Sequence, residues 1–261
     1  MIFHFKDLEP IDLNKLNSIA KEAGEQILNI YNLQPEDMQV TLKNDQSPLT
    51  AADRLSHEVI FKQLTVLTPH IPIISEEGKD IPYETRKNWE YFWCVDPLDG
   101  TKEFIKHNGE FTVNIALIYK NAPVLGVIYI PVTRELYYGG ENIGSWKETA
   151  EGTTTQLHAD KTSTDWIAAV SRSHATSEEA ALLSQYPIKE SITAGSSLKF
   201  CLIAEGRAHI YYRHGPTMEW DTAAGQAIAT NSGAIMTGPN GEPFLYNKSS
   251  LLNSSFLVRV K

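Results

Sequence analysis

The segment Trp93-Cys94-Val95-Asp96-Pro97-Leu98-Asp99-Gly100-Thr101 is the most informative stretch of this 261-residue chain. An apolar strand runs into a turn that carries two carboxylates three residues apart. Pro97 fixes its own φ, and Gly100 permits a conformation that other residues avoid. Such a turn can aim both carboxylates and a backbone carbonyl at one point, and magnesium prefers these hard oxygen ligands. An ordinary turn remains the alternative, because Asp-Pro and Asp-Gly are common turn dipeptides.

Two other acidic segments lie outside this turn. Glu76 and Glu77 follow an apolar strand, where the alternative is a solvated strand end. Asp221 precedes small helix formers, where the alternative to a functional role is the N-cap of a helix. A helix N-terminus also presents free amide groups and the positive end of a dipole, which favour phosphate. The three segments together indicate a cation and phosphate site more strongly than any one of them does.

Composition and charge limit the class of protein. The chain is 42% hydrophobic and 21% charged, as in ordinary globular proteins, and its length allows one or two domains. Its 23 basic and 32 acidic side chains leave a net charge of −9, which disfavours nucleic acid as a partner. A small phosphorylated substrate fits if a cation mediates the contact. Cys94 and Cys201 lie in apolar surroundings and are predicted to be buried thiols.

The first half is predicted to contain two helices followed by a sheet. Apolar residues at steps of three and four predict a helix over 12–31. A second helix is expected over 51–67, with Thr50 as N-cap and Asp53 completing a capping box. Strands are expected at 71–74, 91–95, 111–119, 124–130 and 135–138. We expect residues 1–147 to form an α+β half and the polar, Gly- and Thr-rich stretch 148–161 to be a connecting region.

The second half, 148–261, is predicted to alternate strands and helices, which is typical of an α/β arrangement. Strands are expected at 166–171 and 208–212, and helices at 177–185, 197–205 and 221–231. Gly206 is the expected stop of the helix 197–205. A hairpin is predicted around Asn240 and Gly241 within 233–246. Both halves are expected to form one compact catalytic unit.

No segment predicts membrane insertion. The most apolar stretch, 111–132, contains Asn, Lys and Pro and is predicted to be two strands joined by a turn. Residues 1–7 lack the apolar core of a signal peptide. We expect a cytoplasmic protein, with peripheral attachment to the inner membrane left open.

The order of the three acidic segments resembles the inositol monophosphatase-like superfamily of magnesium-dependent, lithium-sensitive phosphatases. The resemblance extends from Asn44-Asp45-Gln46-Ser47-Pro48-Leu49-Thr50-Ala51-Ala52-Asp53 to Asn253-Ser254-Ser255-Phe256. It implies a layered α/β/α/β/α sugar-phosphatase fold of the α+β class and a phosphomonoesterase that needs no covalent intermediate. In agreement, the sequence has neither a Gly-x-Ser-x-Gly nucleophile elbow nor a Cys-x5-Arg phosphatase loop.

One branch of the superfamily fits best. Residues 102–106, 108–117, 171–174 and 195–201 resemble the branch that removes the 3'-phosphate of adenosine 3',5'-bisphosphate to give AMP. The resemblance also implies dephosphorylation of 3'-phosphoadenylyl sulfate and a role in sulfur assimilation. The alternatives are another phosphatase of the superfamily, acting on inositol monophosphate or another sugar phosphate, and a non-catalytic nucleotide-sensing protein. Intact acidic segments disfavour the second alternative. The sequence leaves the oligomeric state open.

The resemblance also implies residue roles. Two or three magnesium ions are expected, held by the carboxylates of Glu76, Asp96, Asp99 and Asp221 and by the carbonyl of Leu98. Glu77 is expected to aim a metal-bound water, and Thr101 to pass the proton of the nucleophilic water toward Asp45. The amides of Gly100 and Thr101 are expected to bind phosphate. The expected substrate pocket also includes Ser171, His174, Gly195, Ser196, Lys199 and Asp221. For Lys199 the alternative is an exposed lysine on a solvated helix turn.

Overall fold

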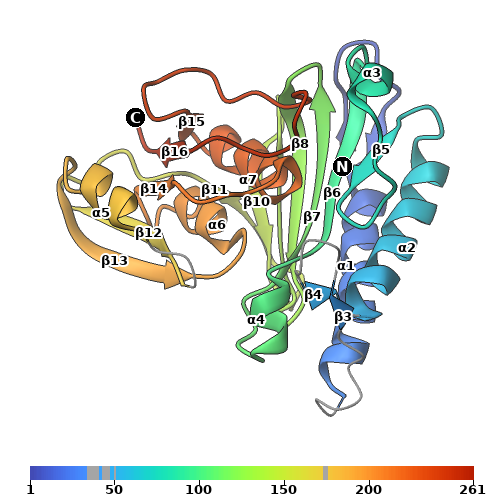
Figure 1. Cartoon of the computed structure of the whole chain (residues 1–261), viewed down its shortest axis with the longest axis horizontal. Helices are drawn as coiled ribbons and strands as arrows, with labels where there is room; N and C mark the ends of the chain where they lie inside the picture. The colour runs from blue at the N-terminus through green and yellow to red at the C-terminus, as the bar shows by residue number, and fades with distance from the viewer. Residues whose placement is uncertain (34–40, 43–47, 50, 173–175) are drawn as a thin grey trace.

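The computed structural model describes residues 1–33, 41–42, 48–49, 51–172 and 176–261. Asp45 and His174, two of the expected site residues, lie outside these ranges, as does the expected N-cap Thr50. Figure 1 shows two sheets with helices packed between them and on their outer faces.

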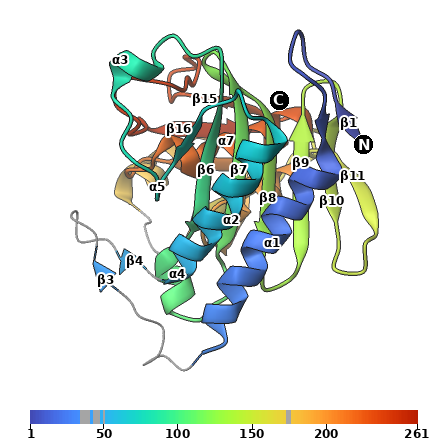
Figure 2. The ribbon, with the colours of Figure 1, turned by 90° about the vertical axis from the view of Figure 1, so that its right-hand side faces the viewer.

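Two antiparallel-running helices cover the outer face of the first sheet (Figure 2). Helix α1 (Leu13–Tyr31) begins after Asp12, whose side chain accepts a hydrogen bond from the amide of Asn14 at 3.0 Å. Helix α2 (Ala51–Leu67) has the predicted bounds. The apolar stripes of both helices are buried in one core with the sheet residues that face them.

The first sheet has seven strands in the order β11-β10-β9-β8-β7-β6-β5. Only β5 and β6 are parallel to each other; the other pairs are antiparallel. The strands are β5 (Ile73–Ser75), β6 (Tyr91–Asp99), β7 (Thr112–Tyr119), β8 (Ala122–Ile130), β9 (Glu135–Gly140), β10 (Gly144–Glu148) and β11 (Thr154–Leu157). The short helices α3 (Tyr83–Arg86) and α4 (Thr101–Ile105) precede and follow β6. The parallel pairing places the carboxyl ends of β5 and β6 side by side, and with them both acidic segments.

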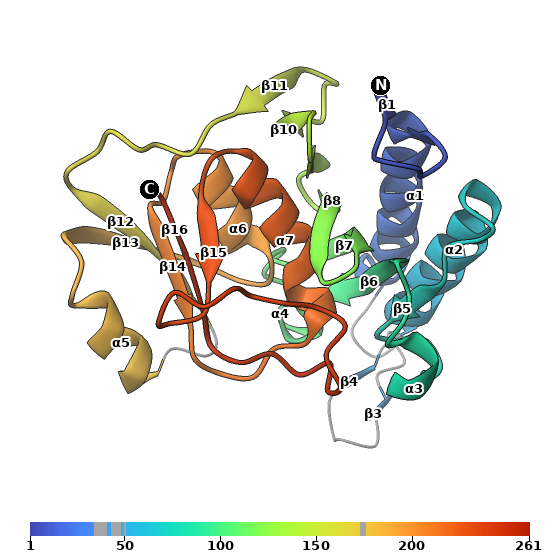
Figure 3. The ribbon, with the colours of Figure 1, turned by 90° about the horizontal axis from the view of Figure 1, so that it is seen from above.

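The second sheet has five strands in the order β13-β12-β14-β16-β15. They are β12 (Trp166–Ser171), β13 (Ile188–Ala194), β14 (Ile210–Arg213), β15 (Ile235–Thr237) and β16 (Phe256–Arg259). Helices α6 (Leu198–Ala204) and α7 (Glu219–Asn231) lie between the two sheets, as the view from above shows (Figure 3). Helix α5 (Ser177–Leu183) packs on the far side of the second sheet. The order of layers is therefore α1/α2, first sheet, α6/α7, second sheet, α5, which confirms the predicted layered fold.

Small elements complete the described chain. Strands β1 (Ile2–Phe3) and β2 (Ile11–Asp12) pair next to α1, and β3 (Thr41–Leu42) pairs with β4 (Pro48–Leu49). Within the described ranges, no helix is both long enough and apolar enough to span a membrane.

Several local predictions were wrong. The stretch 148–161 is more than a connection, because β11 within it extends the first sheet. Strands β13 and β16 were not predicted. The hairpin expected around Asn240 is reduced to one bridge, and β15 pairs instead with the distant β16. Helix α7 begins at Glu219, so Asp221 is not its N-cap. The pairing of β15 with β16 joins segments distant in sequence, which a local pattern does not predict. At the start of α7, Met218 is the N-cap and its amide donates to the Asp221 carboxylate at 2.8 Å.

Candidate active site

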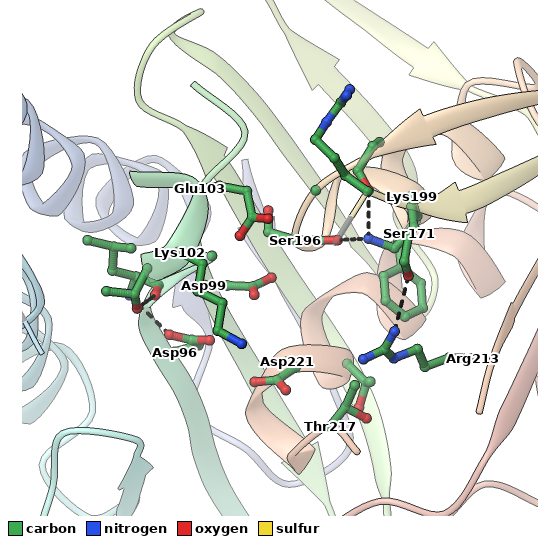
Figure 4. A pocket seen from close by; sticks show the side chains of 18 of the residues that line it. Asp96, Asp99, Lys102, Glu103, Ser171, Ser196, Lys199, Arg213, Thr217 and Asp221 are labelled. Atoms are coloured by element: carbon green, nitrogen blue, oxygen red, sulfur yellow. Dashed lines mark hydrogen bonds between the residues drawn. The ribbon is translucent and has the colours of Figure 1, made fainter. Parts of the chain in front are cut away.

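A cavity of about 250 Å³ lies where the carboxyl ends of β5 and β6 meet α7 and the loops of the second sheet. Asp96, Asp99 and Asp221 lie on one side of the cavity, here called the acidic wall, and Lys199 and Arg213 lie on the opposite side, the basic wall (Figure 4). Of the predicted site residues, the cavity brings together Glu76, Asp96, Leu98, Asp99, Gly100, Thr101, Ser171, Gly195, Ser196, Lys199 and Asp221. Glu77 is next to Glu76 in the chain but does not line the cavity.

The acidic wall contains carboxylates that repel one another. Asp96 is only 2% exposed, and Asp99 and Asp221 are partly buried. Burial, followed by the charges of Glu76, Asp99 and Asp221, raises the pKa of Asp96 well above its ordinary value. Burial also raises the pKa of Asp99, and burial together with the charge of Asp99 raises that of Asp221. A cation in this wall would relieve the repulsion.

The donor set fits magnesium. All the candidate ligands are hard oxygens, and the amide of Leu98 donates to Asp96 at 3.0 Å, which holds that carboxylate within the turn. In the described part of the chain, no three acidic, His or Cys side chains converge closely enough to form a closed ligand cage. The carboxylates line the cavity from the ends of β5 and β6 and from α7. A magnesium ion held among them would need waters and substrate oxygens to complete its coordination, which is common for this ion.

Thr101 has a carboxylate partner that sequence reasoning missed. Its hydroxyl donates to Asp53 Oδ1 at 3.3 Å, and Asp53 is only 1% exposed at the start of α2. The predicted partner, Asp45, lies outside the described residues. Asp53 was assigned to a capping box with Thr50, a role suggested by its position in the first turn of the helix. The signal available in the sequence was the position of Asp53 on the apolar face of the helix 51–67. A carboxylate buried on that face needs a polar partner in the core.

Helix α2 also holds the two acidic turns. Ser56 is buried and donates to the carbonyl of Pro97 at 2.7 Å. His57 Nδ1 lies 2.9 Å from the hydroxyl of Ser75, directly before Glu76. Asp53, Ser56 and His57 share one face of the helix, since they are three and four residues apart. One helix face thus sets the positions of Thr101 and both acidic turns.

Close packing explains two glycines of the site. Gly100 has a φ of +93°, which favours glycine, and a Cβ there would lie 3.1 Å from the carbonyl oxygen of Glu110. A Cβ on Gly195 would lie 2.9 Å from both the Cβ and the carbonyl oxygen of Glu110. The backbone of the 194–197 turn therefore approaches the first half without room for a side chain.

The same turn touches the acidic wall. Ser197 Oγ lies 2.8 Å from Asp99 Oδ2, to which it donates, and 3.0 Å from the carbonyl oxygen of Asp221. Asn114 of β7 donates to Ser197 Oγ at 2.9 Å. The turn between β13 and α6 is in this way tied to two of the candidate metal ligands.

Lys199 is buried rather than solvated, with 4% of its surface exposed. Its amine donates to the carbonyls of Ala194 at 3.1 Å and Ser196 at 2.6 Å, and it lies over the Tyr211 ring. Burial lowers the pKa of Lys199 to about 8, although the nearby charge of Asp99 opposes this shift. The alternative of an exposed lysine was wrong, because α6 lies in the middle layer of the fold.

Three further cations line the cavity: Lys102, Arg172 and Arg213. Arg213 is buried, donates to Ser171 Oγ at 3.2 Å and lies 3.6 Å from the carboxylate of Glu179. Lys102 extends its amine into the cavity on the side of Asp221 (Figure 4). Arg213 and Lys102 were not among the site residues predicted from the sequence, because no local pattern indicates which way their side chains point.

The fold and site together define the class of this protein. Residues 8–259 match the Inositol monophosphatase family, and the chain belongs to that family. Its members are metal-dependent phosphatases, and the basic wall of this cavity suits phosphorylated small molecules.

Comparison with particular proteins narrows the class further. The chain is 46% identical over 249 residues to the 3'(2'),5'-bisphosphate nucleotidase CysQ of Salmonella typhimurium, covering 95% of this chain and 99% of the relative. It is 45% identical over 250 residues to CysQ of Escherichia coli strain K12, with the same coverage. The crystal structure of CysQ from Bacteroides thetaiotaomicron superposes with a TM-score of 0.83 at 44% identity, covering 95% of this chain and 97% of that one.

Proposed function

We propose that this chain is a magnesium-dependent 3'(2'),5'-bisphosphate nucleotidase. It removes the 3'-phosphate of adenosine 3',5'-bisphosphate to give AMP, and also acts on 3'-phosphoadenylyl sulfate. The observation that carries the proposal is a single cavity with repelling carboxylates on one wall and buried cations on the other. The near full-length similarity to curated nucleotidases of that name supports the substrate class.

Glu76, Asp96, Asp99, Asp221 and the Leu98 carbonyl would hold two or three magnesium ions. When bound, magnesium lowers the pKa of a coordinated water and offsets charge on the transferring phosphoryl group. Asp96 and Asp99 lie at the end of β6 in the first half, and Asp221 lies in the first turn of α7 in the second half. Ions held by these ligands would orient the phosphate between the two halves. Glu77, beside Glu76, is assigned to aiming the water.

Thr101 and Asp53 form the proton path in this proposal. The Thr101 hydroxyl donates to Asp53, so its oxygen is left to accept a hydrogen bond from the attacking water. As the water attacks phosphorus, its proton moves to Thr101 Oγ1 while the Thr101 proton moves to Asp53. Asp53 is the final acceptor in this proposal; Asp45, the acceptor predicted from the sequence, lies outside the described residues. The amides of Gly100 and Thr101 would contact the phosphoryl oxygens.

The basic wall would bind the rest of the nucleotide. Two backbone carbonyls hold the Lys199 amine, and Ser171 and Glu179 hold Arg213. Both cations are therefore in place at the cavity before substrate binds. Such preorganisation reduces the entropy lost on binding. Ser196 and His174 complete the assigned substrate pocket. A small anionic ligand is favoured over nucleic acid, because the whole chain carries a net charge of −9.

Phosphate release from a substrate panel tests the proposal. The panel contains adenosine 3',5'-bisphosphate, 3'-phosphoadenylyl sulfate, inositol 1-phosphate and fructose 1,6-bisphosphate, each with and without magnesium. We expect the two nucleotides to have the highest kcat/KM, and only with magnesium. A higher kcat/KM for inositol 1-phosphate would instead assign the chain to the sugar phosphatases of its family.

A further inference from the structure

The connection between α4 and β7 sends one carboxylate across to the second half of the chain. Glu110 lies in this connection, outside the acidic wall, and does not line the cavity. Its Oε2 accepts from Arg172 Nε at 2.6 Å and its Oε1 from Arg172 Nη2 at 2.7 Å. Its Oε2 also accepts from the amide of Gly195 at 2.8 Å. Three donors from the second half thus converge on one side chain of the first.

The two partners of Glu110 belong to different segments of the cavity wall. Arg172 follows β12, and Gly195 follows β13. Arg172 Nη2 also donates to the carbonyl of Thr193 at 3.1 Å, and its amide donates to that of Ala194 at 3.3 Å. Glu110 therefore clasps the ends of two adjacent parallel strands at once. A bidentate pairing of this kind fixes orientation as well as distance.

The clasped backbone leads directly into the basic wall. Ser196 follows Gly195 and has a φ of +37°, a left-handed conformation that a serine adopts only under constraint. Its carbonyl accepts from Lys199 Nζ at 2.6 Å, and its hydroxyl lies 3.4 Å from Thr112 Oγ1. Figure 4 shows Ser196 between Glu103 and Lys199 at the cavity. The position of the Lys199 amine thus depends on a strained turn that Glu110 holds on one side.

The acidic wall is less dependent on this contact. Ser197 bonds Asp99 and is itself held by Asn114, and the Asp96 carboxylate is held by the Leu98 amide. Thr101 is anchored by Asp53 on α2. Ser197 lies on the same turn as Ser196, but none of these contacts involves the Glu110 side chain. We therefore expect them to persist when Glu110 is changed.

We infer that Glu110 is a positioning residue that sets the affinity for the nucleotide part of the substrate without taking part in phosphoryl transfer. The Glu110–Arg172–Gly195 contact, here called the clasp, holds the turn that places Ser196 and Lys199. The inference deepens the proposed function and rests on it.

Steady-state kinetics of Glu110→Gln test the inference. The amide keeps the shape and one acceptor for the Gly195 amide but loses the charge that holds Arg172. The pair is partly exposed, so we expect KM for adenosine 3',5'-bisphosphate to rise about five- to tenfold. We expect kcat to change less than about twofold, and kcat/KM for p-nitrophenyl phosphate, which lacks a nucleotide, to stay within about twofold.

Matched variants separate this role from a general loss of structure. Glu148 of β10 forms another partly exposed ion pair, with Lys21 of α1 at 2.7 Å. Glu148→Gln removes that carboxylate and should leave kcat and KM for both substrates unchanged. Arg172→Gln should raise KM for the nucleotide as Glu110→Gln does. The double variant should resemble either single variant, because both changes break one contact. Thermal unfolding of each variant identifies any that fail to fold, and Arg172→Lys then replaces the failed variant in the same comparison.

The outcomes are distinguishable. Equal losses on both substrates, a fall confined to kcat, or no change in either variant would overturn the role of the clasp while leaving the nucleotidase activity intact. A wild-type protein that does not hydrolyse adenosine 3',5'-bisphosphate but hydrolyses a sugar phosphate would overturn the proposed function and the inference together.

Discussion

The two walls of the cavity both bury charge, but they do so in opposite ways. On the acidic wall, burial raises the pKa of Asp96, Asp99 and Asp221, and neighbouring carboxylates raise that of Asp96 and Asp221 further. At Asp99 a nearby cation, Lys199, opposes the shift. On the basic wall, Lys199 and Arg213 are each held by carbonyls or by a carboxylate. The acidic wall is therefore incomplete without a ligand, while the basic wall is complete before one binds.

This difference separates catalysis from recognition. Carboxylates that repel one another favour whatever cation enters between them, and that cation supplies the chemistry. Lys199 and Arg213 already have polar partners, so each attracts a single phosphate less strongly than a cation without partners would. Their fixed positions instead select a ligand whose shape matches the basic wall. Changes on the acidic wall should accordingly affect every substrate, and changes on the basic wall only the nucleotide.

Metal removal should produce the largest effect. Excess EDTA should abolish hydrolysis of all substrates, because the proposed magnesium ions offset the charge of the transferring phosphoryl group. Ligand at about 100 times its Kd stabilises a fold by about 2.7 kcal/mol, so Tm should fall by roughly 5–10 °C and recover with magnesium. Enzyme assays and differential scanning fluorimetry measure both effects. Full activity in excess chelator would contradict the metal-dependent proposal.

Asp99→Asn should come next. We expect kcat to fall by about two to three orders of magnitude on nucleotide and aryl phosphate alike, the scale of losing a main electrostatic element. The metal-free variant should unfold at the same temperature as wild type or higher, since one source of repulsion is gone and Ser197 can still donate to the amide oxygen. A lower Tm of the metal-free variant would show that Asp99 stabilises the fold, and would contradict the idea that the acidic wall is destabilised by repulsion without a cation.

Asp53→Asn should reduce kcat by about 100-fold on every substrate, because an amide cannot accept the proton passed on by Thr101. The apparent magnesium affinity, measured by isothermal titration calorimetry, should change little, since Asp53 is not a metal ligand in this proposal. Thr101→Ser keeps the hydroxyl and serves as the control, with activity close to wild type. Unchanged kcat in Asp53→Asn would move the proton acceptor to another group, with Asp45 the first to examine.

Lys199→Met should have the most selective effect, because it should be small on any substrate that lacks a nucleotide. Methionine fills the buried space over Tyr211 but makes no bond to the Ser196 carbonyl. We expect kcat/KM for adenosine 3',5'-bisphosphate to fall by about 10- to 150-fold, the range of one charge-assisted contact, and that for p-nitrophenyl phosphate to fall much less. Equal losses on the two substrates would place Lys199 with the acidic wall instead.

Spacing along the chain carries much of the information about the acidic wall. Asp96, Leu98 and Asp99 lie within four residues at the irregular end of β6, so their closeness follows from local geometry. Asp221 and Glu76 could be added because the order of the three segments resembles a known superfamily. The two long helices were also predictable, since apolar residues at steps of three and four specify which face is buried.

Sequence alone therefore determined the family fold, the acidic turns and the kind of chemistry they support. Tertiary structure alone decided that Asp53 meets Thr101, that Lys199 is buried with two carbonyls, and that Glu110 reaches Arg172 and Gly195. These contacts join residues up to 85 positions apart. No local pattern encodes them, because the energy of a buried charge depends on which groups the whole fold brings around it.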